Sequence, residues 1–178
     1  MVEKKLITLA CAAGILACGA CFLPPPPDHP PPPRLELRGI QSIRIEASNV
    51  SKSRHLDPSA LAWGVAGSIN ERTRITGVSA TAQTEAGTTD AVLQIIVVSE
   101  SAQTFPSGGN RLSLLVRISA TLTRQDGQVM WRETDAEYPG SYHFTSANSA
   151  DIWNEPDLQN SVASTVGTWM ARCMFDGY

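Results

Sequence analysis

The sequence predicts an α+β fold, a two-layer sandwich with two helices packed on one face of a mostly antiparallel sheet of four or five strands. Two observations carry this prediction. Several short segments alternate apolar and polar residues, and helical periodicity appears twice, after the first strand and at the C-terminal end. Because each element has one apolar face to bury, the order β-α-β-β-β-β-α favours helices segregated to one side of a sheet.

The first strand and the first helix follow each other directly. Residues 40–48 alternate apolar and polar side chains, which is typical of a half-buried strand. Asp57 is a good N-cap residue and Pro58 suits the first helical position. An amphipathic helix is then expected to about Arg72. Its apolar stripe consists of Leu61, Ala62, Val65, Ala66 and Ile69.

Four further strands are expected in the middle of the chain. Residues 75–82 alternate weakly, residues 91–101 are mostly aliphatic, and residues 112–122 alternate cleanly. The Asp-Gly pair at 126–127 is a strong hairpin signal, so residues 128–138 are expected to return as the last strand. The closing helix carries an apolar stripe of Leu158, Val162, Val166, Trp169, Met170 and Cys173.

The segment Ala91–Ser99 is apolar on both of its strand faces. Since helices cover only one face of the predicted sheet, the other face is expected to expose apolar side chains, and such a surface usually marks a partner. A partner molecule, either a protein or lipid chains, is one explanation of what covers this face. Self-association or unusually thorough coverage by the helices is the alternative.

The N-terminus has the features of an export signal. Lys4 and Lys5 are followed by a short apolar run that stops at Ala17, well below the about 20 residues of a membrane-spanning helix. The cysteine after it resembles the lipobox of bacterial lipoproteins, in which the thiol is acylated, with palmitate among the expected chains, and becomes the mature N-terminus. Cys18 matches this pattern better than Cys21. A plainly cleaved signal with incidental cysteines is the alternative.

These features divide the chain into a signal peptide at 1–17, a lipidated tether at 18–34 and one domain at 35–178. Eight prolines lie in the tether between residues 24 and 33. Such a run adopts extended polyproline II and acts as a semi-rigid spacer, with a docking ligand as the alternative. If Cys18 is lipidated, Cys21 and Cys173 remain as thiols. One interpretation pairs these two thiols in a disulfide. The other leaves Cys173, which lies on an apolar helical face, as a buried free thiol.

Charge and motifs argue against several classes of function. The net charge of −3 does not suit a nucleic-acid-binding protein. None of the three histidines has a neighbour at metal-ligand spacing, and neither a phosphate-binding loop nor a nucleophile elbow is present. Glu133, Asp135 and Glu137 are spaced by two and are expected to share one strand face, as solvated edge charges. We therefore expect a protein that is not an enzyme and has no cofactor or metal.

Five short stretches carry a resemblance to a known family. They are "CG" at 18–19, "LRGI" at 37–40, "DAVLQ" at 90–94, "DGQVMW" at 126–131 and a closing helix that runs into "MFDGY". In this order they resemble the LPS-assembly lipoproteins (LptE type) of Gram-negative outer membranes. The long proline tether and the small number of basic residues depart from that family's pattern.

The resemblance implies a function. In that family a two-layer α/β domain lies inside a large β-barrel translocon, plugs it and assists lipopolysaccharide insertion. It implies a lipid-anchored protein on the periplasmic face of the outer membrane, and Gly19 after the lipidated cysteine agrees with outer-membrane sorting. Arg111, Arg117 and Arg124 are candidates for lipid phosphate or partner contact, or else solvated charges. A homo-oligomeric secretion ring or envelope scaffold is the alternative function.

Overall fold

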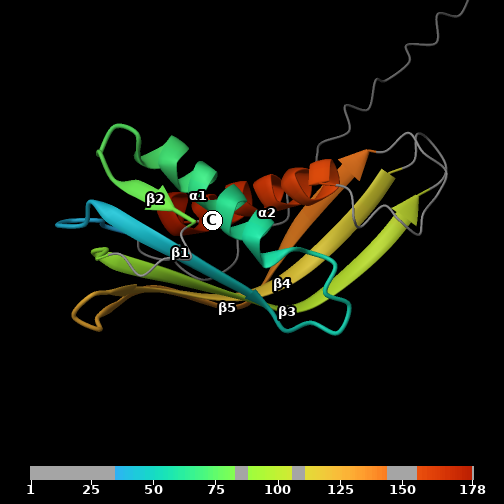
Figure 1. Ribbon diagram of the computed structural model, residues 1–178, viewed down its shortest axis with the longest axis horizontal. Coiled ribbons are helices and arrows are strands. Elements are labelled where there is room, and N and C mark those ends of the chain that lie inside the picture. The colour runs from blue at the N-terminus through green and yellow to red at the C-terminus, as the bar shows by residue number, and fades with distance from the viewer. Residues whose placement is uncertain (1–34, 83–87, 106–110, 144–155, 178) are drawn as a thin grey trace, which may run out of the picture. The chain divides into compact units, whose positions relative to one another are not determined.

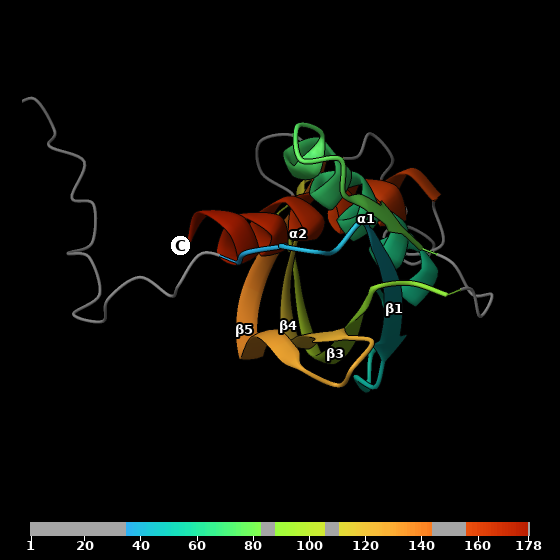
Figure 2. The same cartoon turned by 90° about the vertical axis from the view of Figure 1, so that its left-hand side faces the viewer.

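The computed structural model describes residues 35–82, 88–105, 111–143 and 156–177, which belong to one compact unit. The predicted signal peptide and tether, with Cys18 and Cys21, lie outside these residues. The described elements confirm the α+β sandwich: two helices lie on one side of a five-stranded sheet whose other side they leave uncovered (Figures 1 and 2). No described helix is both long and apolar enough to span a bilayer.

The sheet has the strand order β2-β1-β3-β4-β5. β1 (Ser42–Asn49) pairs in parallel with β2 (Ser79–Thr81) and with β3 (Ala91–Phe105). β4 (Arg111–Arg124) pairs antiparallel with β3 and with β5 (Val129–His143). The long pairings are antiparallel, as expected, and the parallel ones are those of β1.

Two helices complete the fold. α1 (Pro58–Thr73) begins as the sequence predicts, because the Asp57 carboxylate accepts a hydrogen bond from the Ser59 N–H at 2.9 Å. α2 (Pro156–Asp176) lies beside α1. Residues of both helices and of the inward-facing strand positions form one core, in which Ile43, Leu93, Ile118, Val162 and Met170 are fully buried.

Two expectations need correction. The strand expected over 75–82 is only three residues long, because a turn with Gly77 at φ +75° precedes it. Trp169 does not belong to the buried stripe of α2, since it is 40% exposed and lies under the Arg172 guanidinium, 5.3 Å from the ring centroid. Cys173 is a half-buried free thiol. The rest of the stripe is confirmed, because Leu158, Val162, Val166 and Met170 are buried in the core.

Candidate functional site

The sheet face that the helices leave uncovered, here called the open face, is the main candidate surface. The expectation for β3 is confirmed, because Leu93, Ile95 and Val97 are buried toward the helices while Ile96 and Val98 are 42% and 38% exposed. Leu115 of β4 is 41% exposed. These apolar side chains lie among polar ones, so the open face combines both kinds of contact.

An ion pair spans β4 and β5 on the open face. Arg117 donates to Glu137 across the strand pair at 2.6 Å, and both side chains are about half exposed. The hydrogen bond to Glu137 and its negative charge raise the pKa of Arg117. The guanidinium is therefore a permanent positive charge that already has a carboxylate partner.

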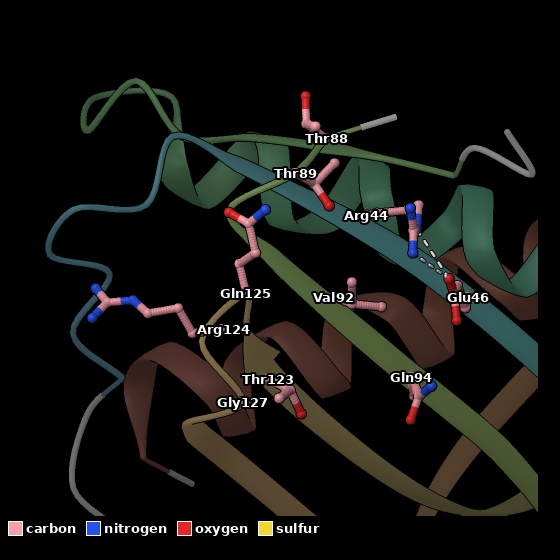
Figure 3. Close-up of a pocket in the computed structure, with 10 residues that line it drawn as sticks. All are labelled: Arg44, Glu46, Thr88, Thr89, Val92, Gln94, Thr123, Arg124, Gln125 and Gly127. Carbon is pink, nitrogen blue, oxygen red and sulfur yellow. Dashed lines mark hydrogen bonds and ion pairs between the residues drawn. The ribbon is translucent and has the colours of Figure 1, made fainter. Parts of the chain in front are cut away.

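A polar hollow of about 570 Å³ lies at one end of the open face. It is lined by side chains from β1, β3, the end of β4 and the β4–β5 hairpin, shown as sticks in Figure 3: Arg44, Glu46, Thr88, Thr89, Val92, Gln94, Thr123, Arg124, Gln125 and Gly127. Arg44 and Glu46 form an ion pair at 2.9 Å. With amides and hydroxyls as most of the remaining lining, the hollow suits neutral hydrogen-bonding groups better than a free anion.

The structure does not bring the three candidate arginines together. Arg117 lies in the middle of the open face, whereas the Arg124 side chain extends away from Arg44 and Glu46 (Figure 3). It donates to the Arg38 carbonyl at 2.5 Å. Arg111 is the first residue of β4, and its side chain lies outside the described part of the molecule. Along β4, Arg117 lies six residues from Arg111 and seven residues from Arg124, and each separation corresponds to about 20 Å of strand.

The three acidic residues of β5 do not share a face, contrary to the sequence-based expectation. The β4–β5 register shifts between Ile118 and Ala120, and Asp135 has φ +53° at this irregularity. As a result Glu137 lies on the open face, while Glu133 turns toward the buried side, where desolvation raises its pKa. Asp135 stays on the open face with Glu137, since its carboxylate accepts a hydrogen bond from the Ser119 hydroxyl and its charge acts on Arg117.

Glu133 lies in a partly buried cluster between β5 and α2. Tyr138 is 3% exposed, and burial is the largest of the causes that raise its pKa, with Cys173 and Glu133 adding to it. Burial likewise raises the pKa of the Cys173 thiol. A thiol held in its protonated form is a poor nucleophile. Among the described residues no group of three His, Cys, Asp or Glu side chains suits a metal ion.

Sequence reasoning missed a second hollow, a groove of about 520 Å³ between β1 and α1. Its lining consists of Ile45, Glu46, Ala47, Pro58, Ser59, Ala62, Trp63 and Ala82. Trp63 is 67% exposed. The signal was present, because Trp63 falls outside the apolar stripe of α1 and an aromatic residue on the outer face of a helix is unusual.

Neither a protein-family model nor a characterised protein matches the amino-acid sequence. Among solved structures, a minor lipoprotein from Acinetobacter baumannii overlaps with 13% identity and a TM-score of 0.42, over 76% of this chain and 90% of that one. The PelC dodecamer from Paraburkholderia phytofirmans overlaps with 15% identity and a TM-score of 0.41, over 80% and 92%. The rare lipoprotein B from Shewanella oneidensis overlaps with 14% identity and a TM-score of 0.31, over 74% and 89%.

Several of these structural neighbours are bacterial lipoproteins by name. Overlaps with TM-scores below 0.5 assign neither their fold nor their role to this chain.

Proposed function

We propose that this protein is a lipid-anchored, non-enzymatic partner of an outer-membrane β-barrel. In this proposal the barrel is a translocon, the domain plugs or assembles it on the periplasmic side, and the pair assists lipopolysaccharide transport and insertion. The lipid is carried by Cys18, with Cys21 as the alternative.

The open face of the sheet carries the proposal. Ile96, Val98 and Leu115 are between 38% and 42% exposed on a face that neither helix covers. Exposed apolar side chains on a continuous sheet surface gain free energy, at about 25 cal/mol per Å² of buried apolar area, when a partner excludes water from them. The polar residues around them provide hydrogen bonds that fix the orientation of such a partner.

The N-terminal segment supports the anchoring. Two or more acyl chains attach a protein stably to a membrane, whereas one does not. The tether from residue 18 to residue 34 has a reach of about 50 Å in the polyproline II conformation. It enters the described domain at Leu35, whose N–H donates to the Met174 carbonyl of α2 at 3.2 Å. The tether therefore joins the described domain beside the C-terminal end of α2.

Of the three candidate arginines, Arg117 is proposed in preference to Arg111 and Arg124 as the residue that contacts the phosphates of lipopolysaccharide. Arg117 lies on the open face, and a phosphate there would replace Glu137 and accept two hydrogen bonds from the guanidinium. Arg124 is already held by the Arg38 carbonyl.

Affinity purification of the tagged full-length protein from a mild-detergent extract of outer membranes tests this function. We expect one large β-barrel to co-elute at about one to one, identified by mass spectrometry. Lipopolysaccharide bound to the pair is measured in the same eluate. Recovery of homo-oligomers without a barrel would overturn the proposal.

A homo-oligomeric ring or scaffold is the second candidate. The observation that favours it is the open sheet, which ends in β5 on one side and in the short β2 on the other. Unpaired edges allow head-to-tail association of identical chains, which closes into a ring when the rotation permits. The same purification separates the two functions by stoichiometry.

A further inference from the structure

α2 packs against β5 along one side of the sheet, and their contact is here called the α2–β5 seam (Figure 2). A Cβ atom at Gly140 of β5 would lie 2.7 Å from Cγ1 of Val162, so the two elements are in direct contact there. Toward the other end of the seam, Glu133 and Tyr138 of β5 meet Cys173 of α2. The charge of Glu133 acts on both Tyr138 and Cys173, so the three side chains form one cluster.

The Tyr138 hydroxyl has no hydrogen-bond partner in the described part of the chain. Tyr138 is 3% exposed, and its hydroxyl oxygen is buried. Most buried hydroxyl groups in native proteins are hydrogen-bonded, so an unpartnered one indicates a functional or conformational role. Tyr138 therefore provides no hydrogen bond that would hold an ionised group in the seam.

Glu133 brings a carboxyl group into this seam, because the β4–β5 irregularity at Asp135 turns it toward the helices. Its ladder partner on β4 is the uncharged Ala120, which is 2% exposed. None of the described residues forms an ion pair or a hydrogen bond with the Glu133 side chain, and desolvation raises its pKa. The carboxyl group is therefore partly buried without a partner for its ionised form.

The surrounding charged and titratable groups do not neutralise this carboxylate. On β5, Arg132 and Asp135 lie on the open face, on the other side of the sheet. On α2, the Arg172 guanidinium lies over the ring of Trp169, 5.3 Å from its centroid. The remaining titratable neighbour is the Cys173 thiol, whose pKa is raised by burial and by the charge of the carboxylate. Within the described residues, the seam therefore favours the neutral form of all its groups.

The cost of ionising Glu133 determines how the seam responds to pH. Because the pKa of Glu133 is higher in the folded protein than in an exposed chain, the closed seam binds more protons than the open seam. The closed form is therefore fully stabilised below the pKa of an exposed glutamate, and it loses this stability as pH rises through the pKa of the closed form.

We propose that the α2–β5 seam is a proton-controlled contact, held most firmly when Glu133 is protonated and opening more readily when Glu133 is ionised. Cys173 precedes Met174, whose carbonyl oxygen accepts a hydrogen bond from the Leu35 N–H. The seam thus lies beside the point where the described domain begins, and loss of the proton loosens the end of α2 that holds Leu35. This inference depends neither on the barrel partner nor on the lipid anchor.

Labelling of the Cys173 thiol in the full-length protein tests the proposal. Cys173 is a partly buried free thiol, so a neutral aromatic disulfide reagent reaches it fully only when the seam opens. Mass spectrometry of the peptide that contains Cys173 measures the rate. We expect Glu133→Gln to slow the labelling about threefold or more at about pH 7, and to leave it unchanged at about pH 4, where Glu133 of the wild type is protonated. Because both proteins carry the same thiol, the ratio of their rates removes the intrinsic pH dependence of the reaction.

Asp135→Asn is the matched control, because it removes a carboxylate from the same strand but on the open face, and asparagine tolerates the positive φ of this position. This variant should label at the wild-type rate at both pH values, and circular dichroism verifies that each variant folds. Equal rates for the wild type and Glu133→Gln at about pH 7 would overturn the inference. Equal slowing at both pH values would also overturn it, because the substitution and not the proton would then be the cause.

The wild type alone gives a second reading that does not depend on a variant. Its labelling rate, divided by that of an unfolded peptide with the same cysteine, should rise from about pH 4 to about pH 7. A ratio that stays constant or falls would overturn the inference. Neither reading involves a barrel, so the outcome is separate from that of the proposed function.

Discussion

The carboxylate of Glu100 holds the segment that joins β1 to α1. It accepts hydrogen bonds from the His55 and Leu56 N–H groups at 2.7 and 2.9 Å, and from the Asn49 amide and the Ser53 hydroxyl at 2.8 Å each. Burial opposes ionisation, but the N–H groups of Leu56 and His55 and the two side-chain donors outweigh it and lower the pKa of Glu100. The carboxylate of Glu100 therefore fixes the conformation of the segment between β1 and α1.

We expect Glu100→Gln to lower the free energy of unfolding at neutral pH by about 1–2 kcal/mol, an amount reduced by the half-exposure of the group. Because the pKa of Glu100 is lower in the folded state, its contribution is present above its unfolded pKa and is lost as pH falls through the folded value. Urea unfolding from about pH 7 to about pH 3 measures this. The exposed Glu36→Gln is the control, and an equal acid sensitivity of the wild type and Glu100→Gln would contradict the assignment.

At the other end of β1, the carboxylate of Asp90 also holds the backbone in place through hydrogen bonds. Its carboxylate accepts hydrogen bonds from the Gln41 and Ser42 N–H groups and from the Ser42 hydroxyl, which lower its pKa. β1 is therefore fastened to the chain around β3 at both ends by carboxylates.

The two helices cross at glycines. A Cβ atom at Gly64 would lie 2.6 Å from the backbone of Ala163, and one at Gly167 would lie 2.6 Å from the Gly64 carbonyl oxygen. Backbone atoms cannot yield as a flexible side chain does, so these positions set how closely α1 approaches α2. Close approach of the helices in turn fixes the α1 wall of the groove.

We expect Gly64→Ala to destabilise the fold by about 1–3 kcal/mol, because the overpacking outweighs the gain in helix propensity. Gly67→Ala is the matched control in the same helix, since nothing lies within 4 Å of a Cβ at that position. It should be neutral or stabilise by up to about 1 kcal/mol. Thermal unfolding of the two variants measures the difference, and similar melting temperatures would show that the helices can separate without cost.

At the scale of the whole molecule, one side of the sheet makes the core and the other remains available. Leu35 connects the tether to the C-terminal end of α2, and Arg72 forms an ion pair with Asp176 nearby. Lipidation is expected to set the location of the protein, and the open face is expected to make the partner contact.

We expect Cys18→Ala to shift the protein from the membrane into the soluble periplasmic fraction, because the acyl chains are its covalent anchor and only the contact with the barrel then remains. Cys21→Ala should leave it in the membrane fraction. Immunoblots of separated membrane and soluble fractions measure both. Retention of Cys18→Ala together with release of Cys21→Ala would move the lipid to Cys21.

Local patterns were sufficient for most elements. The Asp57–Pro58 start of α1 was predicted and is confirmed by the Ser59 hydrogen bond. The Asp-Gly hairpin is confirmed by Gly127 at φ +87°. The two apolar faces of β3 were also readable, because strand alternation is a local property. The lipid anchor and the barrel partner stay predictions.

Tertiary structure alone decided the features on which binding depends. The parallel pairing of β1 with β3 joins residues about fifty positions apart, such as Ile43 and Ala91, and no local pattern encodes it. The irregularity at Asp135 moved Glu133 to the other face, and among the described residues β2 pairs only with Ser42–Arg44 of β1. The sequence by itself determined which segments become helices and strands, since periodicity acts over a few residues. Register, strand length and edge exposure depend on contacts between distant segments, so only the folded chain decides them.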